Sequence, residues 1–270
     1  MEKQMYTYKY PRPSVTTDCV VFGFDGRDLK ILLIERGLEP YKGSWAFPGG
    51  FLNMNETAEQ GALRELREET GLNLNYLKQV GAFSAVDRDP RDRVITIAFY
   101  ALAKKASVQG GDDAARAQWF PIDDVPHLAF DHDYILRKTM DKLRRDLHFE
   151  PIGFGLLDDE FTIPELQRLY EAILGVRFDR RNFHKKMLQT GILDEVDEDD
   201  DNTFFFGKNK EMKSMDIGAL FGDSMAREPR ASYATHDDDS RSTRRWGTKF
   251  RFNKRRYDEF KENGNFRLEF

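Results

Sequence analysis

Two runs of β-branched and apolar residues near the start of the chain, 16–23 and 29–36, are separated by a short polar connection. Runs of this length and composition are typical of β-strands. The Asp25-Gly26 pair between them favours a tight turn, because glycine adopts the backbone angles that such turns require. The sequence therefore predicts an antiparallel hairpin.

Residues 57–70 have the pattern of a helix with both ends marked. Thr57 and Gln60 have the spacing of a capping box, in which each side chain binds the backbone N–H group of the other residue. Gly71 stands where a helix C-cap is expected. The Gly/Pro-rich segment 48–50 predicts a turn shortly before this helix.

Further along, 79–86 and 94–103 have the composition of strands and flank the polar loop 87–93, and 131–147 has a helical pattern. Strands and helices thus follow one another through the first half of the chain. We expect an α+β domain over residues 1–148.

The pattern changes in the second half, where 163–173 and 179–189 predict two helices joined by a short turn. The segments 192–196 and 249–252 have the composition of strands and can pair. Two helices followed by two paired strands are the outline of a winged helix-turn-helix domain, which we expect over residues 149–270.

A long insert, 197–247, separates these two strands. It begins within a run of eight residues, 194–201, of which seven are acidic, and 237–239 are three more aspartates. High charge density with little periodicity favours disorder. The apolar segments 204–206 and 215–221 are suited to dock against a folded surface, so we expect the insert to be partly unstructured.

Composition narrows the class of protein. Hydrophobic residues make up 40% of the 270 positions, enough for the core of one large domain or two small ones, which excludes disorder throughout. Lys and Arg number 42 against 47 Asp and Glu, a net charge of -5, so binding to nucleic acid must be local. The single cysteine, Cys19, excludes an intramolecular disulfide and suits a reducing compartment. With no evident signal peptide or membrane span, we expect a cytoplasmic protein without membrane contacts.

Three carboxylates of the helix predicted at 57–70, Glu65, Glu68 and Glu69, fall within an arc of roughly 100°. Like charges one turn apart destabilise a helix unless a cation offsets them, and oxygen ligands favour Mg²⁺ or Mn²⁺. Arg64 precedes Glu68 by one turn and can pair with it or orient it. Gly50 lets the backbone approach closely enough for its carbonyl group to join the metal ligands.

The segment from Gly50 to Leu72 has a glycine, five residues, Glu56, seven residues and then Arg-Glu-Leu-Arg-Glu-Glu-Thr-Gly-Leu. This segment resembles the Nudix box at every fixed position of that motif. The resemblance implies a Nudix α/β/α sandwich that hydrolyses a nucleoside diphosphate linked to another moiety, with metal ions neutralising the pyrophosphate. It also implies that Arg64, Glu65, Glu68 and Glu69 form the catalytic and metal-binding set. Glu68 and Glu69 would be the principal metal ligands, and Glu65 a ligand or the general base. Glu56 would help Arg64 to hold the loop and the helix together.

Candidates for substrate contacts lie on both sides of this motif. Trp45 and Phe47 suit a pocket for a flat base, although aromatic residues in strands also serve as core. Arg88, Arg91 and Arg93 suit a phosphate or a ribose-linked group, or else form a charged hairpin loop. The sequence leaves these alternatives open.

Positive charge is concentrated in the second half, where 241–257 holds eight Lys or Arg residues and no acid. A winged helix binds duplex DNA with a recognition helix in the major groove and a basic wing on the backbone. Basic faces are also common on small helices. The candidate DNA contacts are Arg180, Arg181, Lys185 and Lys186 of the second helix, and Lys249 and Arg251 of the wing.

A Nudix domain followed by a winged helix, with 161–188 leading into it, resembles the Nudix-related transcriptional regulators of the NrtR type. The closing segment 249–270 resembles the ends of such proteins. The resemblance implies a homodimer that binds palindromic duplex DNA and a Nudix domain that binds ADP-ribose or a related ligand. The acidic insert departs from the family pattern, and we expect it to lengthen the wing and to compete with DNA.

Two hypotheses follow. In the first, the protein is a regulator that binds DNA and both binds and hydrolyses an ADP-ribose-like metabolite with Mg²⁺, since every fixed carboxylate of the Nudix box is present. In the alternative, it is a dedicated Nudix pyrophosphohydrolase whose C-terminal domain mediates dimerisation or protein contacts. The sequence identifies neither the general base nor the second moiety of the substrate nor the operator.

Overall fold

The computed structural model describes residues 7–104, 114–196 and 247–263, so nearly all of the expected insert lies outside the described residues. The predicted helices and strands are all present: 29–36 and 249–252 have the predicted ends, and the ends of the others are shifted by one to three residues. The elements are β1 (Ser14–Phe24), β2 (Leu29–Arg36), β3 (Trp45–Ala46), β4 (Gly49–Phe51), α1 (Ala58–Thr70), β5 (Lys78–Phe83), β6 (Val94–Leu102), β7 (Ala114–Pro121), η1 (Ile122–Asp124), α2 (His132–Phe149), η2 (Ile152–Leu156), β8 (Phe161–Thr162), α3 (Ile163–Leu174), α4 (Arg180–Gln189), β9 (Leu193–Glu195), β10 (Lys249–Phe252) and α6 (Lys254–Glu262).

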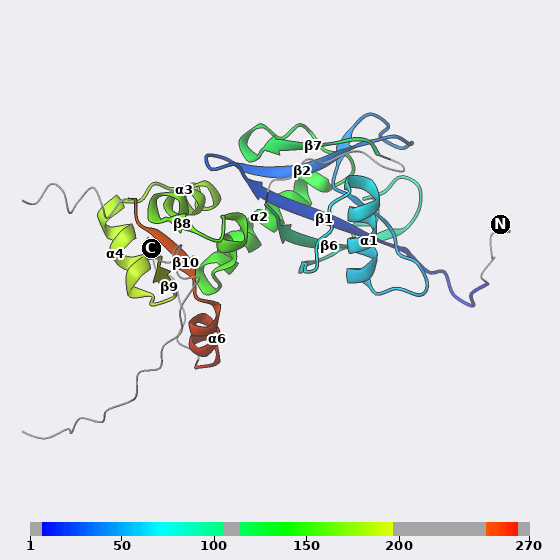
Figure 1. The fold of residues 1–270 in the computed structure, drawn as a ribbon. Helices are drawn as coiled ribbons and strands as arrows, with labels where there is room; N and C mark the ends of the chain where they lie inside the picture. Colours follow the sequence, from blue (N-terminus) through cyan, green and yellow to red (C-terminus); the bar gives the residue numbers. More distant parts are fainter. Residues whose placement is uncertain (1–6, 105–113, 197–246, 264–270) are drawn as a thin grey trace, which may run out of the picture.

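A mixed sheet forms the centre of the first domain (Figure 1). β1 pairs antiparallel with β2, which confirms the predicted hairpin, and parallel with β6. β5 pairs antiparallel with β6, β3 and β7 both pair with β2, and β4 pairs with β1. β3 and β4 escaped prediction because they are only 2 and 3 residues long, too short to show a period.

Successive residues of β1 pack on opposite faces of this sheet, as the two-residue period of a strand requires. Cys19 and Val21 belong to the apolar cluster that contains Leu66 of α1. Val20 belongs to the cluster that contains Leu143 of α2. One helix therefore covers each face (Figure 1), which confirms the α/β/α sandwich.

The second domain combines α3 and α4 with a three-stranded sheet in the order β8-β10-β9. β9 and β10 pair antiparallel, as predicted, while the short strand β8 was not predicted. A capping box of Thr162 and Glu165 starts α3, and the Asp179 side chain accepts the Asn182 N–H group at the start of α4. The winged helix-turn-helix expectation is confirmed.

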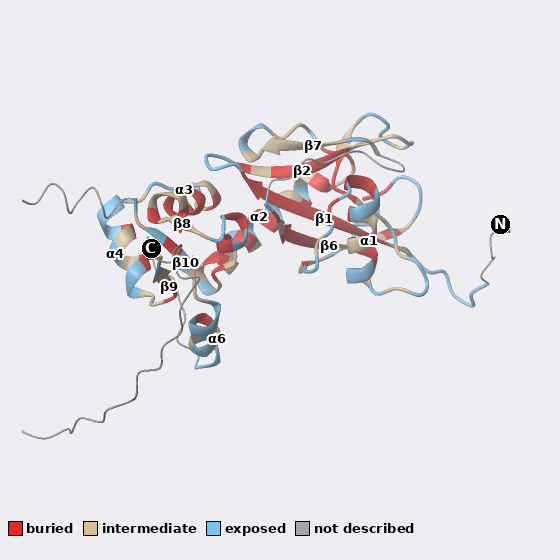
Figure 2. Cartoon of the chain, viewed as in Figure 1, coloured by how far each residue is buried: buried red, intermediate tan, exposed pale blue. Residues whose placement is uncertain are grey.

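The two domains share a continuous apolar cluster. It extends from β1 and α2 to Tyr170 of α3, Phe183 of α4 and Phe250 of β10. Figure 2 shows buried residues in the strands of the central sheet and on the inner sides of α3 and β10.

Helix α2 ends at Phe149, close to the domain boundary expected after residue 148. The boundary itself stays a prediction. In the described ranges, no helix is long and apolar enough to cross a membrane.

Candidate functional site

Arg64 of α1 holds three carboxylates at once. Its Nη2 and Nε donate to the two carboxylate oxygens of Glu56 at 2.7 and 3.0 Å, and its Nη1 donates to Glu65 at 2.8 Å and to Glu68 at 3.0 Å. The hydrogen bonds from Arg64 lower the pKa of Glu56 to about 2. The expected pairing of Arg64 with Glu68 is confirmed, and the same guanidinium ties the preceding loop to the helix.

The turn before α1 lies so close to its surroundings that it needs glycine. The Gly49 N–H group donates to Glu69 Oε2 at 2.8 Å. A Cβ atom would lie 2.4 Å from Glu65 Oε1 at Gly50, and 2.2 Å from the Thr17 carbonyl oxygen at Gly49. Both distances are too short for any side chain, so the glycine pair is what brings the backbone against the acidic helix.

Two carboxylates of α1, those of Glu65 and Glu69, are partly desolvated, whereas Glu68 is exposed. Glu69 is buried, and burial raises its pKa to about 8, aided by the charges of Glu65 and Asp18 and opposed by the hydrogen bond from Gly49. Burial also raises the pKa of Glu65. A cation at this face would favour the charged form of both groups.

The donor set fits a hard divalent cation. Glu65, Glu68 and Glu69 offer carboxylate oxygens, which are the ligands that Mg²⁺ and Mn²⁺ prefer, and the backbone of Gly50 lies close to Glu65. Among the described residues, no three acidic, histidine or cysteine side chains are already clustered as metal ligands. Each of the three glutamates accepts a protein N–H group at one carboxylate oxygen, which leaves its other oxygen available to a metal ion.

A cavity of about 340 Å³ opens beside the acidic helix and reaches the first residue of α2. Strands β1 and β2, the glycine turn, the loop after β5 and the segment before α2 all contribute to its wall. Its lining includes Asp18, Arg36, Phe47, Gly50, Glu65, Glu69, Arg88, Arg91, Phe130 and His132.

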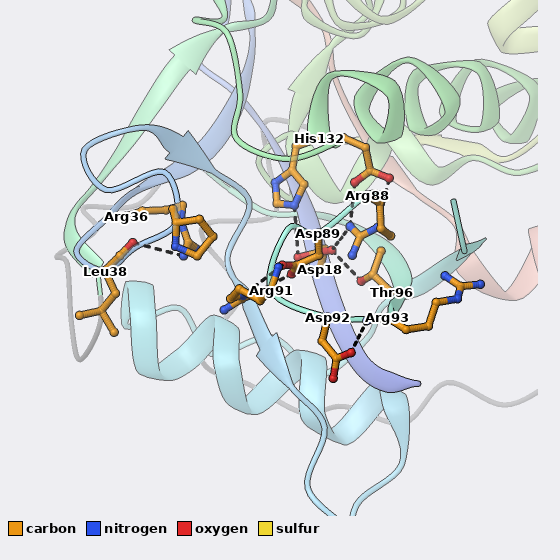
Figure 3. A network of polar contacts seen from close by, with 12 residues as sticks. Asp18, Arg36, Leu38, Arg88, Asp89, Arg91, Asp92, Arg93, Thr96 and His132 are labelled. Atoms are coloured by element: carbon orange, nitrogen blue, oxygen red, sulfur yellow. Dashed lines mark hydrogen bonds and ion pairs between the residues drawn. The ribbon is translucent and has the colours of Figure 1, made fainter. Parts of the chain in front are cut away.

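Asp18 is the centre of a buried polar network in this cavity (Figure 3). Its Oδ2 accepts a hydrogen bond from Thr96 Oγ1 at 2.6 Å and lies 3.7 Å from the Arg88 guanidinium. Its Oδ1 lies 3.7 Å from His132 Nε2. Arg88 also forms a bidentate pair with Asp131 at 2.7 and 3.1 Å, so its charge is neutralised within the protein.

His132 connects α2 to the segment that precedes the glycine turn. Its Nδ1 accepts the Phe47 N–H group at 3.1 Å, which places the proton of the neutral imidazole on Nε2, facing Asp18. The rings of Phe47 and His132 stack with centroids 4.8 Å apart and planes at 8°. Burial lowers the pKa of His132, so the ring is neutral at pH 7. The start of α2 therefore helps to fix the turn that contacts Glu69.

Two arginines of the cavity lie near the ring of Phe130. The guanidinium carbon is 4.8 Å from the ring centroid in Arg36 and 5.5 Å in Arg91. Arg91 forms a bidentate pair with Asp89 at 2.7 and 3.0 Å. Arg36 donates to backbone carbonyl oxygens of the loop that follows β2. The two cations are thus held differently, although they face the same ring.

α4 leaves its predicted basic residues accessible. Arg180, Arg181 and Lys185 are exposed and Lys186 is half-buried, while Phe183 and Met187 of the same helix pack into the core. A helix that enters the major groove needs such an accessible polar face.

The wing residues Lys249 and Arg251 are exposed on β10 and face Glu160. Lys249 Nζ lies 3.5 Å from the Glu160 carboxylate, and Arg251 Nη2 donates to the same group. The hydrogen bond from Arg251 lowers the pKa of Glu160, which keeps this acid charged. A DNA phosphate at the wing would therefore have to replace Glu160.

Comparison with known families matches both halves of the chain. Residues 12–143 match the NUDIX domain, and residues 153–204 match the NrtR DNA-binding winged helix domain. The ADPR responsive transcriptional repressor NtrR of Acinetobacter baylyi is 34% identical over 194 residues, which are 70% of this chain and 78% of that protein. The chain belongs to the NrtR family.

Two further NrtR-like or Nudix relatives cover different lengths of the chain. The ADP-ribose pyrophosphatase of Methanocaldococcus jannaschii is 41% identical over 131 residues, 48% of this chain and 75% of that protein. Shewanella oneidensis NrtR, solved in complex with a 27mer DNA, has a TM-score of 0.60 and 29% sequence identity, covering 68% of this chain and 89% of that chain. The NrtR-family architecture therefore extends through both domains.

Two of the substrate residues predicted for this NrtR-family chain, Trp45 and Arg93, are not part of the cavity lining. Trp45 packs edge-on against Phe120 with centroids 4.7 Å apart, because β2 pairs with both β3 and β7, a strand that was not predicted. Arg93 Nη1 donates to the Ala85 carbonyl oxygen at 3.2 Å, across the base of the loop between β5 and β6. The other three, Phe47, Arg88 and Arg91, do line the cavity.

Among the cavity residues that the sequence analysis missed are Asp18, Arg36, Phe130 and His132. Asp18 had a detectable signal, a carboxylate within a strand of apolar residues, because an unpaired charge is costly to bury there. The other three lie at or near the end of a strand or the start of a helix. Their neighbours in space come from distant parts of the sequence, so no local pattern identifies them as cavity residues.

Proposed function

We propose that this NrtR-family protein is an ADP-ribose-responsive transcriptional repressor whose Nudix domain also hydrolyses its nucleotide ligand. The proposal rests on one observation: the same chain contains two functional parts. The first is a complete acidic Nudix helix beside a cavity, and the second is a winged helix whose basic helix α4 is accessible. A repressor described as ADPR responsive and an ADP-ribose pyrophosphatase are among its relatives. The ligand class is ADP-ribose or a related nucleoside diphosphate derivative.

At the acidic helix, the proposal assigns Glu68 and Glu69 as the principal ligands of Mg²⁺ or Mn²⁺, with the Gly50 carbonyl group as a further ligand. Glu65 is a ligand or the general base. Nudix hydrolases generally use divalent metal ions, and the bound cation would neutralise charge on the pyrophosphate. Arg64 aligns the carboxylates through its simultaneous hydrogen bonds to Glu65 and Glu68.

Other groups of the chain would bind and orient the ligand. Phe47 and Arg91 line the cavity. The Phe47 ring is buried and stacks on His132, and the Arg91 guanidinium is already paired with Asp89, so the proposed role of both is to shape the pocket around the ligand. Arg88 is buried and already paired with Asp131, so its proposed role is to hold Asp18 in place rather than to contact the ligand.

In the second domain, the proposal places α4 in the major groove of duplex DNA, with Arg180, Arg181, Lys185 and Lys186 as contacts. Lys249 and Arg251 would contact the phosphate backbone from the wing. Binding of a palindromic site would require a homodimer, because each subunit supplies one recognition helix.

The enzymatic part is tested by incubating the protein with ADP-ribose and Mg²⁺ and measuring AMP and ribose 5-phosphate. We expect metal-dependent formation of both products, and loss of activity in Glu68→Gln. Parental turnover by Glu68→Gln would contradict the ligand assignment. Binding of ADP-ribose without cleavage would contradict hydrolysis but not the sensor.

The regulatory part is tested by fluorescence anisotropy with duplexes selected from a random library. We expect saturating ADP-ribose to lower the affinity for DNA. We also expect Arg181→Ala to lower this affinity and, if the residue contacts a phosphate, to make the affinity depend less on salt concentration. Equal DNA affinity with and without ADP-ribose would contradict the sensor.

The intact carboxylate set also supports a second candidate, a dedicated pyrophosphohydrolase whose C-terminal domain mediates dimerisation or protein contacts. The two candidates predict the same products from ADP-ribose. A chain that hydrolyses ADP-ribose and retains no duplex in the selection would favour this second candidate.

A further inference from the structure

Four arginines line the Nudix cavity, and one of them differs from the others in how its charge is balanced. Arg64, Arg88 and Arg91 each have a carboxylate oxygen at 2.7 Å. Arg36 has no carboxylate partner among the described residues and donates only to backbone carbonyl oxygens. No direct ion pair within the described residues therefore occupies its guanidinium, which leaves this group available to an anion of a ligand.

The guanidinium of Arg36 is held in a defined orientation. Its Nε donates to the Pro40 carbonyl oxygen at 2.9 Å and its Nη2 to the Leu38 carbonyl oxygen at 3.4 Å, and the group lies 4.8 Å from the Phe130 ring centroid. A guanidinium has five N–H donors in a planar fork, so three of them remain for a ligand. A group fixed in this way loses little entropy when it binds.

The surroundings of Arg36 favour an anion. The side chain is half-buried. Burial and the positive charge of Arg91 lower the pKa of Arg36 and outweigh the charges of Glu69, Asp89 and Asp18, which raise it, although a guanidinium stays charged at pH 7. A partly desolvated cation without a direct carboxylate partner is costly, and an anionic group from a ligand would reduce that cost. Phosphate oxygens match the fork geometry of the guanidinium.

We propose that Arg36 is the anion-binding residue of the cavity, and that it binds a phosphate oxygen of the nucleoside diphosphate ligand. This inference rests on the proposed function, because it concerns the ligand of the same cavity. It also changes the prediction from sequence, in which Arg88, Arg91 and Arg93 were the phosphate candidates. Arg88 and Arg91 are already paired, and Arg93 is not in the cavity lining.

The test compares Arg36→Gln and Arg36→Lys with Arg93→Gln. Arg93 is a matched control, because its side chain also donates to a backbone carbonyl oxygen without a carboxylate partner in the described ranges, but outside the cavity lining. Affinities for ADP-ribose, ADP and inorganic pyrophosphate are measured by titration calorimetry, in EDTA and again with Ca²⁺ in place of Mg²⁺ to avoid turnover.

We expect Arg36→Gln to weaken all three ligands by about 10- to 100-fold, as loss of a charge-assisted hydrogen bond does. Arg36→Lys should lose less, because it keeps the charge without the planar fork, and Arg93→Gln should match the parent. Unchanged affinities in Arg36→Gln would overturn the assignment, and so would a loss confined to ADP-ribose with normal pyrophosphate binding. Failure of the parent protein to bind any of the three would instead contradict the proposed function.

A second measurement uses the parent protein alone, in case Arg36→Gln does not fold. Phenylglyoxal modifies accessible guanidinium groups, and the modified residues are identified by peptide mass spectrometry. We expect pyrophosphate to protect Arg36 and to leave Arg93 as reactive as before. Equal modification of Arg36 with and without saturating pyrophosphate would overturn the proposal.

Discussion

Gly50 shows how a missing side chain shapes the Nudix site. A Cβ atom here would lie 2.4 Å from Glu65 Oε1 and 2.5 Å from its Cδ, so an added methyl group must displace that carboxylate. We expect Gly50→Ala to lower kcat/KM for ADP-ribose on the order of 10²-fold, as displacement of a catalytic group does. Gly81→Ala is the control, because its Cβ would meet no atom within 4 Å. Equal activity in the two variants would contradict this account.

Asp146 gives a prediction about pH. Its Oδ2 accepts hydrogen bonds from Tyr100 at 2.6 Å and from Lys78 at 3.2 Å. Burial opposes the charged form, but these bonds outweigh it and hold the pKa of Asp146 below its usual value. The stabilisation is therefore present above the unfolded pKa of about 3.9 and is lost as the pH falls through the lower folded value.

We expect Asp146→Asn to lower the free energy of unfolding at pH 7 by about 1–2 kcal/mol, measured by urea denaturation. The difference from the parent should shrink progressively below about pH 4. Asp141→Asn, at an exposed position of the same helix, is the control and should have little effect at either pH. A difference that stays constant between pH 7 and pH 3 would show that the charge of Asp146 does not matter.

At the scale of elements, the N-terminus of α1 is stabilised by residues of the helix and its cap. Thr57 Oγ1 accepts the Gln60 N–H group at 3.2 Å, and Gln60 Oε1 accepts the Thr57 N–H group at 2.9 Å. We expect Thr57→Ala to lower the free energy of unfolding by about 1 kcal/mol in chemical denaturation. Glu59→Ala, exposed in the same turn, should cost less, about 0.3 kcal/mol. Equal losses would mean that the cap is not what stabilises this end.

The elements predicted from sequence are those whose turns, caps or residue periods can be recognised from residues close together in the chain. The β1–β2 hairpin has its turn residues in place, and α1 and α3 have their caps, as read directly from neighbouring positions. β3, β4 and β8 consist of 2 or 3 residues and exist only because a neighbouring strand offers hydrogen bonds. Such strands have no period of their own, so a sequence pattern cannot reveal them.

At the scale of the whole molecule, hydrogen bonds join the Nudix domain to the winged helix besides the shared apolar core, and two of them reach α3. Arg144 Nε of α2 donates to the Ile173 carbonyl oxygen at 3.0 Å, and Arg168 Nε of α3 donates to the Gly26 carbonyl oxygen at 3.0 Å. α2 begins at His132 in the cavity, and the β1–β2 turn that includes Gly26 joins two strands that line it. Both contacts therefore connect cavity elements to α3.

We expect the Arg144→Ala and Arg168→Ala double variant to reduce the effect of ADP-ribose on DNA affinity, because fewer contacts transmit a change in the cavity to α3. Coupling between two ligands is typically worth about 1–3 kcal/mol and is reciprocal, so DNA should affect ADP-ribose binding equally. The measurement is DNA affinity with and without saturating ADP-ribose. Arg177→Ala is the control, since its ion pair with Glu171 stays within the winged helix. Undiminished coupling in the double variant would contradict a role for these contacts.

The sequence by itself determined the acidic helix, its caps, the glycine turn and the order of the two domains. These features depend on residues within about one helix length of each other, as the contacts of Arg64 with Glu56, Glu65 and Glu68 illustrate. Only the tertiary structure decided which side chains face the cavity and which cations are already neutralised. His132 contacts Phe47 across 85 positions, and Thr96 contacts Asp18 across 78. Burial and charge pairing depend on such distant neighbours, which is why Arg36, without a direct carboxylate partner among the described residues, could be recognised only in the folded chain.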